Sequence, residues 1–441
     1  MAPGPRFRSR SALLVVLAML GVVLAVEGGG KGMLPHRVFS LVLGLSLAAP
    51  FASYLWRGPR AIAAMRRGLL FMLPTALILL LLELGVRLAD VETWAWPEQR
   101  PHPLLEFQYL PHSGGMDAWG FRNRAVPERA EIVVLGDSTS YGFGVLRSET
   151  YPSVLAARTG RSVYNMGIGQ YGPVQYYALA RRALELRPAV VVIGIFLGND
   201  LLDAHRVGTR TAWRRLHEAG ATHPELIALP EGTAVSLFDA LRPQRERGYA
   251  PRMLFALERS SRAIGWLTTR TRIQLYTSRY LAGIYESEPD APAFDGDGIA
   301  TLFAPRHRSQ SLELADARVR EGLTLTRTAL RRTRQLLEAA GVRLVLMPIY
   351  TKEHYYQEQL LARGSVPESM ARLHALESAA ARELERFADG QSLTWLDTRQ
   401  ALRGALAAGE PAFFTNVDVH MAPAGHRALA RLLADAQALK P

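Results

Sequence analysis

The chain has 441 residues, carries a formal net charge of +12 and contains no cysteine. The absence of cysteine excludes disulfide bonds, zinc–thiolate sites and a cysteine nucleophile. Proteins that bind nucleic acid gather their positive charge on one face, whereas the arginines of this chain are scattered through helical stretches. We therefore expect no nucleic-acid partner, while anionic polymers and lipid headgroups stay open as partners.

Three apolar runs open the chain, at residues 12–26, 38–56 and 69–88. At about 1.5 Å per residue, the second and third runs are long enough to cross a membrane core of about 30 Å. The first run is shorter and also fits the apolar region of a cleaved signal peptide. We therefore predict an N-terminal membrane region at residues 1–90 with two to three transmembrane helices.

The distribution of arginine and lysine predicts how these helices are oriented. Three arginines precede the first run and four lie at residues 57–67, whereas only Lys31 and Arg37 lie between the first two runs. Because positive charge favours the cytoplasmic side, the chain beyond residue 89 is predicted to lie outside the cytoplasm. Trp94 and Trp96 follow at once, where an aromatic belt at the membrane interface is expected.

A lead-in segment at residues 91–130 precedes a predicted α/β domain at 131–441. Short apolar runs alternate with helical patterns, which is typical of a parallel sheet covered on both faces. The expected strands are 132–135, 162–166, 190–196, 344–347 and 393–396, and the expected helices are 150–158, 173–186, 312–340, 366–388 and 423–437. Residues 201–310 are too long for a plain connection, so we predict an inserted lid or subdomain there.

The stretch VVLGDSTSYG at 133–142 places Ser138 directly after the first expected strand. In such sheets ligands bind at the carboxyl ends of the strands. If a helix begins here, its free backbone N–H groups face the serine hydroxyl and can stabilise an oxyanion. The pattern fits a nucleophile, and it equally fits a serine that caps a helix.

Two further loops follow strands. The stretch NMGIGQYG at 165–172 contains glycines that let a backbone approach a ligand closely. The stretch FLGND at 196–200 places Asn199 where a side-chain amide can donate to an oxyanion. An ordinary glycine loop and an ordinary turn are the alternatives for these two stretches.

Near the C-terminus, Asp418 and His420 stand two residues apart before the last expected helix. In an extended loop, residues i and i+2 point the same way. The carboxylate can then hold His420 in the tautomer that accepts a serine proton; a satisfied surface histidine is the alternative. His426 is a rival base, but it falls within the helical pattern, which favours a packing or capping role.

Together these stretches supply a nucleophile, oxyanion donors, a base and an orienting carboxylate, the parts that acyl transfer needs. They resemble the blocks of the SGNH/GDSL hydrolases: GDS at Ser138, NMGIGQYG, GND at Asn199, and DVH with PAGH at the end. The resemblance spans about residues 115–437. It includes WGFRNR at 119–124, which is similar to the lead-in of membrane-anchored bacterial members.

Two departures from the family pattern are visible. In the family, the oxyanion glycine stands five residues after the asparagine that begins the glycine block. In this chain that block is NMGIGQYG at 165–172, and Gln170 occupies the position, next to Gly169. Many members place the aspartate three residues before the histidine, whereas Asp418 and His420 are two apart. This shorter spacing is similar to that of members that acetylate bacterial exopolysaccharides.

The resemblance implies a flavodoxin-like three-layer α/β/α sandwich with a parallel five-stranded sheet. It implies a membrane-anchored serine esterase or acyl hydrolase at the bacterial inner membrane, with its catalytic domain periplasmic and acting on an acylated carbohydrate or lipid ester. The implied catalytic residues are Ser138, Asp418 and His420, and the implied oxyanion hole is formed by Ser138, Gly169, Gln170 and Asn199. Neither a metal nor an organic cofactor is implied.

Two alternatives to an esterase stay open. The first is an O-acetyltransferase that modifies an exopolysaccharide or the cell envelope and receives its acyl group through a membrane donor protein. The second is a non-catalytic carbohydrate-binding module on a hydrolase scaffold. The retention of Ser138, Asn199, Asp418 and His420 together argues against the second alternative.

Overall fold

In the computed structural model, the described part of the chain is 97–210 and 281–439 without 297 and 365, part of 74–92, and positions 213, 263 and 266. The chain divides into two compact units, Met1–Ala95 with Thr233–Arg270 and Trp96–Gly232 with Thr271–Pro441. The sheet and the helices that surround it belong to the second unit.

The first two apolar runs lie outside the described residues, and the third lies partly within them. The described positions of the third run, 80–86 among them, are helical. Within the described residues, no helix is both long enough and apolar enough to cross a bilayer. The membrane region therefore stays a prediction.

A parallel five-stranded sheet forms the centre of the second unit, in the order β4-β3-β5-β8-β9. Numbered along the chain, this order is 2-1-3-4-5, the flavodoxin-like arrangement. All seven residues of β5 are buried, as expected for a strand covered on both faces. The α/β fold with five parallel strands is therefore confirmed. The strands are β3 (Ile132–Gly136), β4 (Val163–Asn165), β5 (Val190–Phe196), β8 (Arg343–Ile349) and β9 (Thr394–Trp395).

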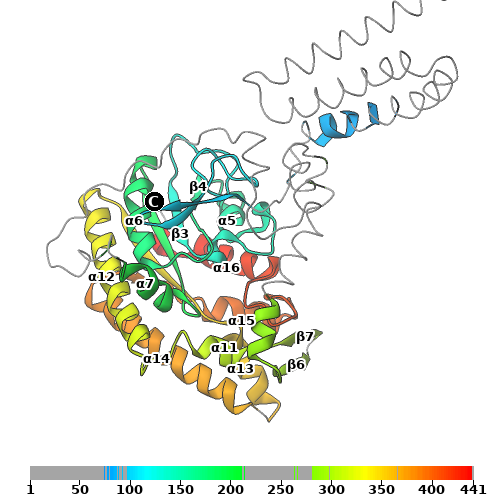
Figure 1. Ribbon diagram of the computed structural model, residues 1–441, viewed down its shortest axis with the longest axis vertical. Coiled ribbons are helices and arrows are strands. Elements are labelled where there is room, and N and C mark those ends of the chain that lie inside the picture. The colour runs from blue at the N-terminus through cyan, green and yellow to red at the C-terminus, as the bar shows by residue number, and fades with distance from the viewer. Residues whose placement is uncertain are drawn as a thin grey trace, which may run out of the picture. The chain divides into compact units, whose positions relative to one another are not determined.

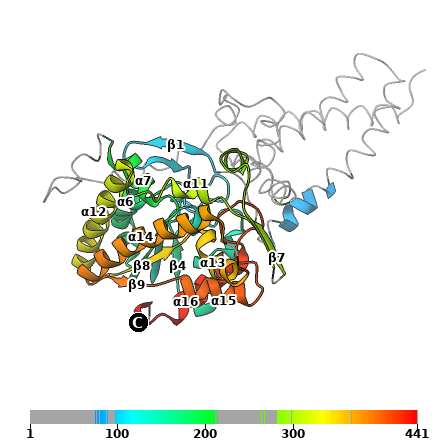
Figure 2. The ribbon, with the colours of Figure 1, turned by 90° about the horizontal axis from the view of Figure 1, so that it is seen from below.

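Helices cover both faces of this sheet (Figures 1 and 2). On one face, α6 (Pro173–Ala183), α7 (Asp200–Gly208) and α12 (Ala317–Ala339) pack against one another. On the other face, α5 (Tyr151–Thr159) packs against α16 (Pro423–Asp435). The carboxyl ends of the strands thus stay uncovered by these helix layers and are shaped by loops.

Several helices differ from the sequence expectation, and α7, which lies where the insertion was predicted to begin, is one of them. α12 begins at Ala317 rather than at 312, because the Asp316 carboxylate accepts a hydrogen bond from the Arg318 N–H at 2.8 Å and caps the helix there. Neither α13 (Lys352–Ala362) nor α15 (Arg399–Ala407) was predicted. The first five residues of α13 are all buried, so they show no amphipathic period. The remaining predicted helix is α14 (Glu368–Gly390).

The lead-in segment packs directly on the sheet domain. It begins with an antiparallel hairpin of β1 (Gln99–His102) and β2 (Glu106–Tyr109). The Asp117 carboxylate then accepts hydrogen bonds from the Tyr164 hydroxyl at 2.7 Å and from the Trp119 N–H at 2.8 Å. Because Tyr164 belongs to β4, the first of these bonds ties the lead-in to the edge of the main sheet.

Only the ends of the predicted insertion at 201–310 are among the described residues. Its start forms α7, which belongs to the helix layer. Its end forms a hairpin of β6 (Ala293–Gly296) and β7 (Ile299–Leu302), followed by α11 (Pro305–Ser309). Residues 211–280 lie outside the described residues apart from 213, 263 and 266, so the role of a lid stays a prediction.

Candidate active site

Ser138 lies at the carboxyl end of β3. The strand ends at Gly136, Asp137 follows, and Ser138 is the first residue of the next helix. The cap of the following helix, α4 (Ser138–Tyr141), is Asp137, whose carboxylate accepts from the Thr139 N–H at 2.9 Å. Ser138 is therefore not the cap, and its partly exposed side chain is free for another role. α4 has only four residues. An oxyanion beside Ser138 would therefore be bound by the backbone N–H of Ser138 and not by a helix dipole.

Arg122, which is 4% exposed, binds the turn formed by α4 and the residues after it. Its guanidinium donates to the carbonyl oxygens of Tyr141 at 3.2 Å, Gly142 at 2.6 Å and Val145 at 2.7 Å. Tyr141 and Gly142 are at the end of α4 and Val145 lies beyond it, so Arg122 joins the helix end to the turn that follows. The sequence singled out WGFRNR at 119–124 without assigning this role.

Asp418 and His420 meet Ser138 from the other end of the chain. His420 Nε2 lies 2.8 Å from Ser138 Oγ, and His420 Nδ1 lies 2.5 Å from Asp418 Oδ1. The Asp418 carboxylate also accepts from the backbone N–H of His420 at 3.0 Å. The structure thus brings the three residues into the hydrogen-bonded order serine, histidine, aspartate that a catalytic triad requires.

Both partners of Ser138 are shielded from water. Asp418 is fully buried and His420 is 5% exposed, with the Phe143 ring centred 4.4 Å from the imidazole. Burial alone acts to raise the pKa of Asp418, but the His420 ring, its hydrogen bonds and the Lys352 ammonium hold that pKa below its ordinary value. Asp418 is therefore a carboxylate at neutral pH and fixes a proton on His420 Nδ1, which leaves Nε2 to accept from Ser138.

Asp137 is a second acceptor beside the serine. Its Oδ2 lies 3.1 Å from Ser138 Oγ, which is longer than the 2.8 Å distance to His420 Nε2. Burial raises the pKa of Asp137, while the hydrogen bonds from Thr139 counteract that rise. Because a hydroxyl has one proton, Ser138 donates to one of the two acceptors at a time, and His420 offers the shorter bond.

The glycine loop lies directly against the serine. A Cβ added to Gly169 would be 3.6 Å from the Ser138 Cβ, so the backbone of Gly169 faces the nucleophile position. Gln170 has φ +68°, a left-handed conformation that favours glycine, and its side chain is exposed. Arg206 donates to the Gln170 carbonyl at 2.7 Å and holds the turn. The departure from the family glycine therefore leaves the backbone in the conformation that glycine would adopt.

Asn199 follows β5, the strand next to β3 in the sheet, and occupies the cap position before α7. The turn is fixed by its neighbour Asp200, whose carboxylate accepts from the Phe196 N–H at 3.1 Å and the Tyr176 hydroxyl at 3.2 Å. Burial raises the pKa of Asp200 well above its ordinary value. Asn199 therefore lies at the same edge of the sheet as Ser138, on a turn that a buried acid anchors.

His426 does not join this arrangement. It is 1% exposed within α16, and its Nδ1 accepts from the Tyr151 N–H at 3.2 Å. Burial, together with the Arg122 and His420 charges, lowers the pKa of His426 to about 3. A ring that stays neutral and bonds a backbone N–H is a packing residue, so His426 is not the base.

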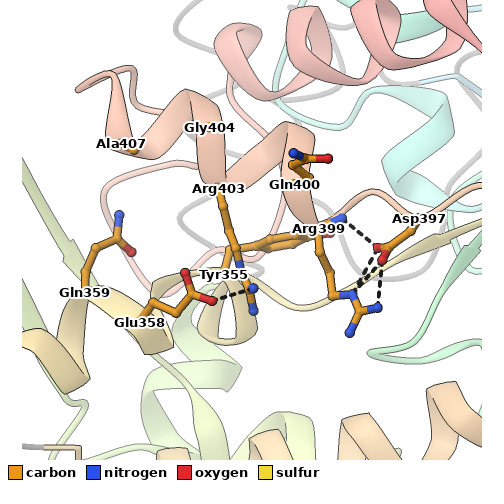
Figure 3. A pocket seen from close by; sticks show the side chains of 9 residues that line it. All are labelled: Tyr355, Glu358, Gln359, Asp397, Arg399, Gln400, Arg403, Gly404 and Ala407. Atoms are coloured by element: carbon orange, nitrogen blue, oxygen red, sulfur yellow. Dashed lines mark hydrogen bonds and ion pairs between the residues drawn. The ribbon is translucent and has the colours of Figure 1, made fainter.

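A separate pocket of about 540 Å³ lies between α13 and α15 (Figure 3). Its two arginines already have carboxylate partners: Arg399 binds Asp397 at 2.7 Å and Arg403 binds Glu358 at 2.6 Å. None of the predicted site residues lines this pocket. Across the described residues, no three histidine, aspartate or glutamate side chains are grouped so as to hold a metal ion.

One family model matches part of the chain. Residues 308–441 match the model of the SGNH hydrolase-like domain described as acetyltransferase AlgX. This match contains Asp418 and His420 but not Ser138 or Asn199. No curated protein matches the chain by sequence.

Two solved structures are similar to the chain at low identity. A catalytic mutant of an acetylxylan esterase from Geobacillus stearothermophilus is 13% identical with a TM-score of 0.33, covering 72% of this chain and 99% of that one. A GDSL-like lipase from Bacteroides thetaiotaomicron is 12% identical with a TM-score of 0.29, covering 69% of this chain and 85% of that one. At these identities and TM-scores, neither structure supports a conclusion about the function of this chain. The family match agrees with the resemblance predicted from the sequence: residues 308–441 are similar to an SGNH hydrolase-like domain.

Proposed function

We propose that the protein is a serine esterase in which Ser138, His420 and Asp418 form the catalytic triad and the substrate is an O-acyl or O-acetyl ester. The observation that carries this proposal is the pair of distances at His420, with 2.8 Å from Nε2 to Ser138 Oγ and 2.5 Å from Nδ1 to Asp418 Oδ1. Both lie within the reach expected between a nucleophile, its base and the group that orients the base.

The proposed reaction has two steps. Ser138 Oγ forms a bond to the ester carbonyl carbon while its proton moves to His420 Nε2, and the carbonyl oxygen takes the electron pair. When this tetrahedral species collapses, the bond to the leaving oxygen breaks and His420 gives that oxygen its proton. An acyl group then remains on Ser138. A water molecule or a sugar hydroxyl releases it in the second step, with His420 again acting as the base.

We assign the oxyanion to three donors at the carboxyl edge of the sheet. They are the Ser138 N–H, a backbone N–H at Gly169 or Gln170, and the Asn199 amide. The contact of Gly169 with Ser138 supports the second donor. The position of Asn199 after the strand beside β3 supports the third. Loss of one such donor lowers kcat by about 10²–10³-fold in serine hydrolases.

A second candidate function is transfer of an acetyl group to an exported polysaccharide. The family model that matches residues 308–441 is described as an acetyltransferase, and the Asp418–His420 spacing of two favours the same reading. In this function the sugar hydroxyl replaces water in the second step, and a membrane protein delivers the acyl donor. The triad and its first step are the same in both functions. A binding module without catalysis would not need the base and its orienting carboxylate.

We further propose that the apolar runs before residue 90 anchor the protein in the bacterial inner membrane with the triad on the periplasmic side. The distribution of arginine and lysine around the runs supports this orientation. The described part of the third run also exposes Leu77, Ile78 and Leu81, which are more than half exposed. Apolar side chains of this kind are favourable in lipid and unfavourable in water.

The test uses the full chain in membranes with an acetylated oligosaccharide and an unacetylated acceptor oligosaccharide. Release of acetate that is lost in Ser138→Ala supports the esterase, whereas acetyl transfer to the acceptor that exceeds acetate release supports the transferase. Equal release of acetate by the wild type and by Ser138→Ala would contradict both functions.

A further inference from the structure

Lys352 is a buried cation that the proposed reaction does not yet use. It is 0% exposed and is one of three lysines in a chain whose positive charge comes mostly from arginine. It is also the first residue of α13, where the helix end disfavours a positive charge. Burying an ammonium is costly unless several acceptors surround it, so this position calls for a specific set of partners.

Two of the three partners belong to the loop that carries Asp418 and His420. The Lys352 ammonium donates to the carbonyl oxygen of Asn416 and, at 3.3 Å, to that of Phe414. Its third acceptor is the hydroxyl of Thr301, at 3.1 Å, in the β6–β7 hairpin. Lys352 therefore joins three segments that are far apart in the sequence: α13, the hairpin and the residues just before the triad pair.

A continuous series of hydrogen bonds leads from the ammonium to the nucleophile. Lys352 binds the Asn416 carbonyl, and the Asn416 side chain accepts from the Asp418 N–H at 2.8 Å. Asp418 in turn binds His420 at 2.5 Å, and His420 binds Ser138 at 2.8 Å. A displacement of the loop at Asn416 is thereby passed to the imidazole.

The ammonium also acts electrostatically on Asp418, in the same direction as His420 but more weakly. One oxygen of that buried carboxylate, Oδ2, has no hydrogen-bond donor among the described residues. The charged groups that act on Lys352 are Glu353 on its own helix, Asp418 on the loop and Arg308 on α11. Among these, Asp418 is the one that belongs to the triad, and the Lys352 charge acts to keep it ionised.

We propose that Lys352 is a positioning residue of the active site: its ammonium fixes the loop at Phe414 and Asn416, and its charge adds to the groups that favour the ionised form of Asp418, which holds His420 as a base. This inference rests on the proposed triad. Burial lowers the pKa of Lys352 to about 8, so its charge is lost when the pH rises above that value. The rate of serine acylation is then expected to fall on the alkaline side.

The experiment measures the rate at which a fluorophosphonate labels Ser138 in the full chain, from pH 5 to pH 9.5. Lys352→Met removes the charge and keeps most of the side-chain volume. Arg320→Met is the matched control, because Arg320 is exposed on α12 and likewise donates to two backbone carbonyls, at 3.1 Å and 2.6 Å. We expect labelling at neutral pH to fall about 10- to 100-fold in Lys352→Met, the scale of an ångström misplacement, and to stay unchanged in Arg320→Met.

The shape of the pH profile separates this role from simple packing. Lys352→Met has no ammonium to lose, so its labelling rate should lack the fall on the alkaline side that the wild type shows. Thr301→Val removes one acceptor of the ammonium and lowers the pKa of Lys352, so its alkaline limb should move to lower pH. A variant that only loosened the fold would lower the rate without moving the alkaline limb.

Two results would overturn the inference. One is a folded Lys352→Met protein that labels at the wild-type rate and keeps the alkaline fall of the wild type. If Lys352→Met does not fold, an unshifted alkaline limb in Thr301→Val overturns it instead. A folded wild type that is not labelled at Ser138 at all would contradict the proposed triad itself, and the inference with it.

Discussion

The substitution Asp418→Asn isolates the charge of the carboxylate from its geometry. A single oxygen, Asp418 Oδ1, accepts both the backbone N–H and the Nδ1–H of His420, at 3.0 Å and 2.5 Å. An asparagine carbonyl at the same place can accept both bonds, and the other carboxylate oxygen has no donor to lose among the described residues. The ring orientation should therefore survive, while the negative charge that stabilises the imidazolium is lost.

The expected size of this effect follows from Coulomb's law. Opposite unit charges about 4 Å apart in an effective dielectric of about 20 attract by roughly 4 kcal/mol, which corresponds to about three orders of magnitude in rate. Lys352 acts on the same carboxylate and already offsets part of this field at the imidazole. We therefore expect the acetyl-esterase kcat/KM of Asp418→Asn to fall by about 10²–10³-fold.

The assay compares Asp418→Asn with His420→Ala, both in the full chain, using acetyl-ester hydrolysis and labelling of Ser138. His420→Ala removes the base altogether and should lower the rate by about 10⁴-fold. If Asp418→Asn falls as far as His420→Ala, the ring orientation is lost too and the reasoning from Oδ1 is wrong. A rate within threefold of the wild type would equally refute it, because the charge would then be unused.

Three further predictions concern the surroundings of the triad. Arg122→Met removes the guanidinium that binds the carbonyl oxygens of Tyr141, Gly142 and Val145, so the midpoint of thermal unfolding and the labelling rate of Ser138 should both fall, in contrast to exposed Arg320→Met. At Gln170, where φ is +68°, glycine should keep the esterase rate within about threefold, whereas the β-branched Gln170→Val should lower it; the reverse order would contradict the assigned turn. His426 has a folded pKa of about 3, below its ordinary value, so the unfolded chain binds the extra proton and stability is lost as pH falls from about 6.5 towards 3. His426→Gln should flatten this loss in a pH series of unfolding midpoints.

The sequence predicts the sheet well because its strands are buried on both faces and read as short apolar runs. β5 has the bounds 190–196 in both prediction and structure. α13 was not predicted because its burial follows from the elements packed around it and leaves no amphipathic period in the sequence. α12 was extended to 312 because Leu312 and Leu314 continue the apolar pattern, which Asp316 interrupts as a cap.

The site residues were predictable where each follows a strand or precedes a helix in a recognisable string. The choice between nucleophile and cap for Ser138 could not be made from the string GDS, because both Asp137 and Ser138 are good caps. The structure assigns the cap to Asp137. The supporting cations Arg122 and Lys352 bind backbone carbonyls of distant segments, and carbonyls leave no trace in the sequence.

The central claim is that Ser138 is a nucleophile activated by His420. The most direct measurement treats the full chain with a fluorophosphonate and locates the adduct by mass spectrometry in the wild type, Ser138→Ala and His420→Ala. The account predicts one adduct on Ser138 in the wild type and none above background in either variant. A folded wild type without an adduct, or an adduct that persists at Ser138 in His420→Ala at the wild-type rate, would contradict it.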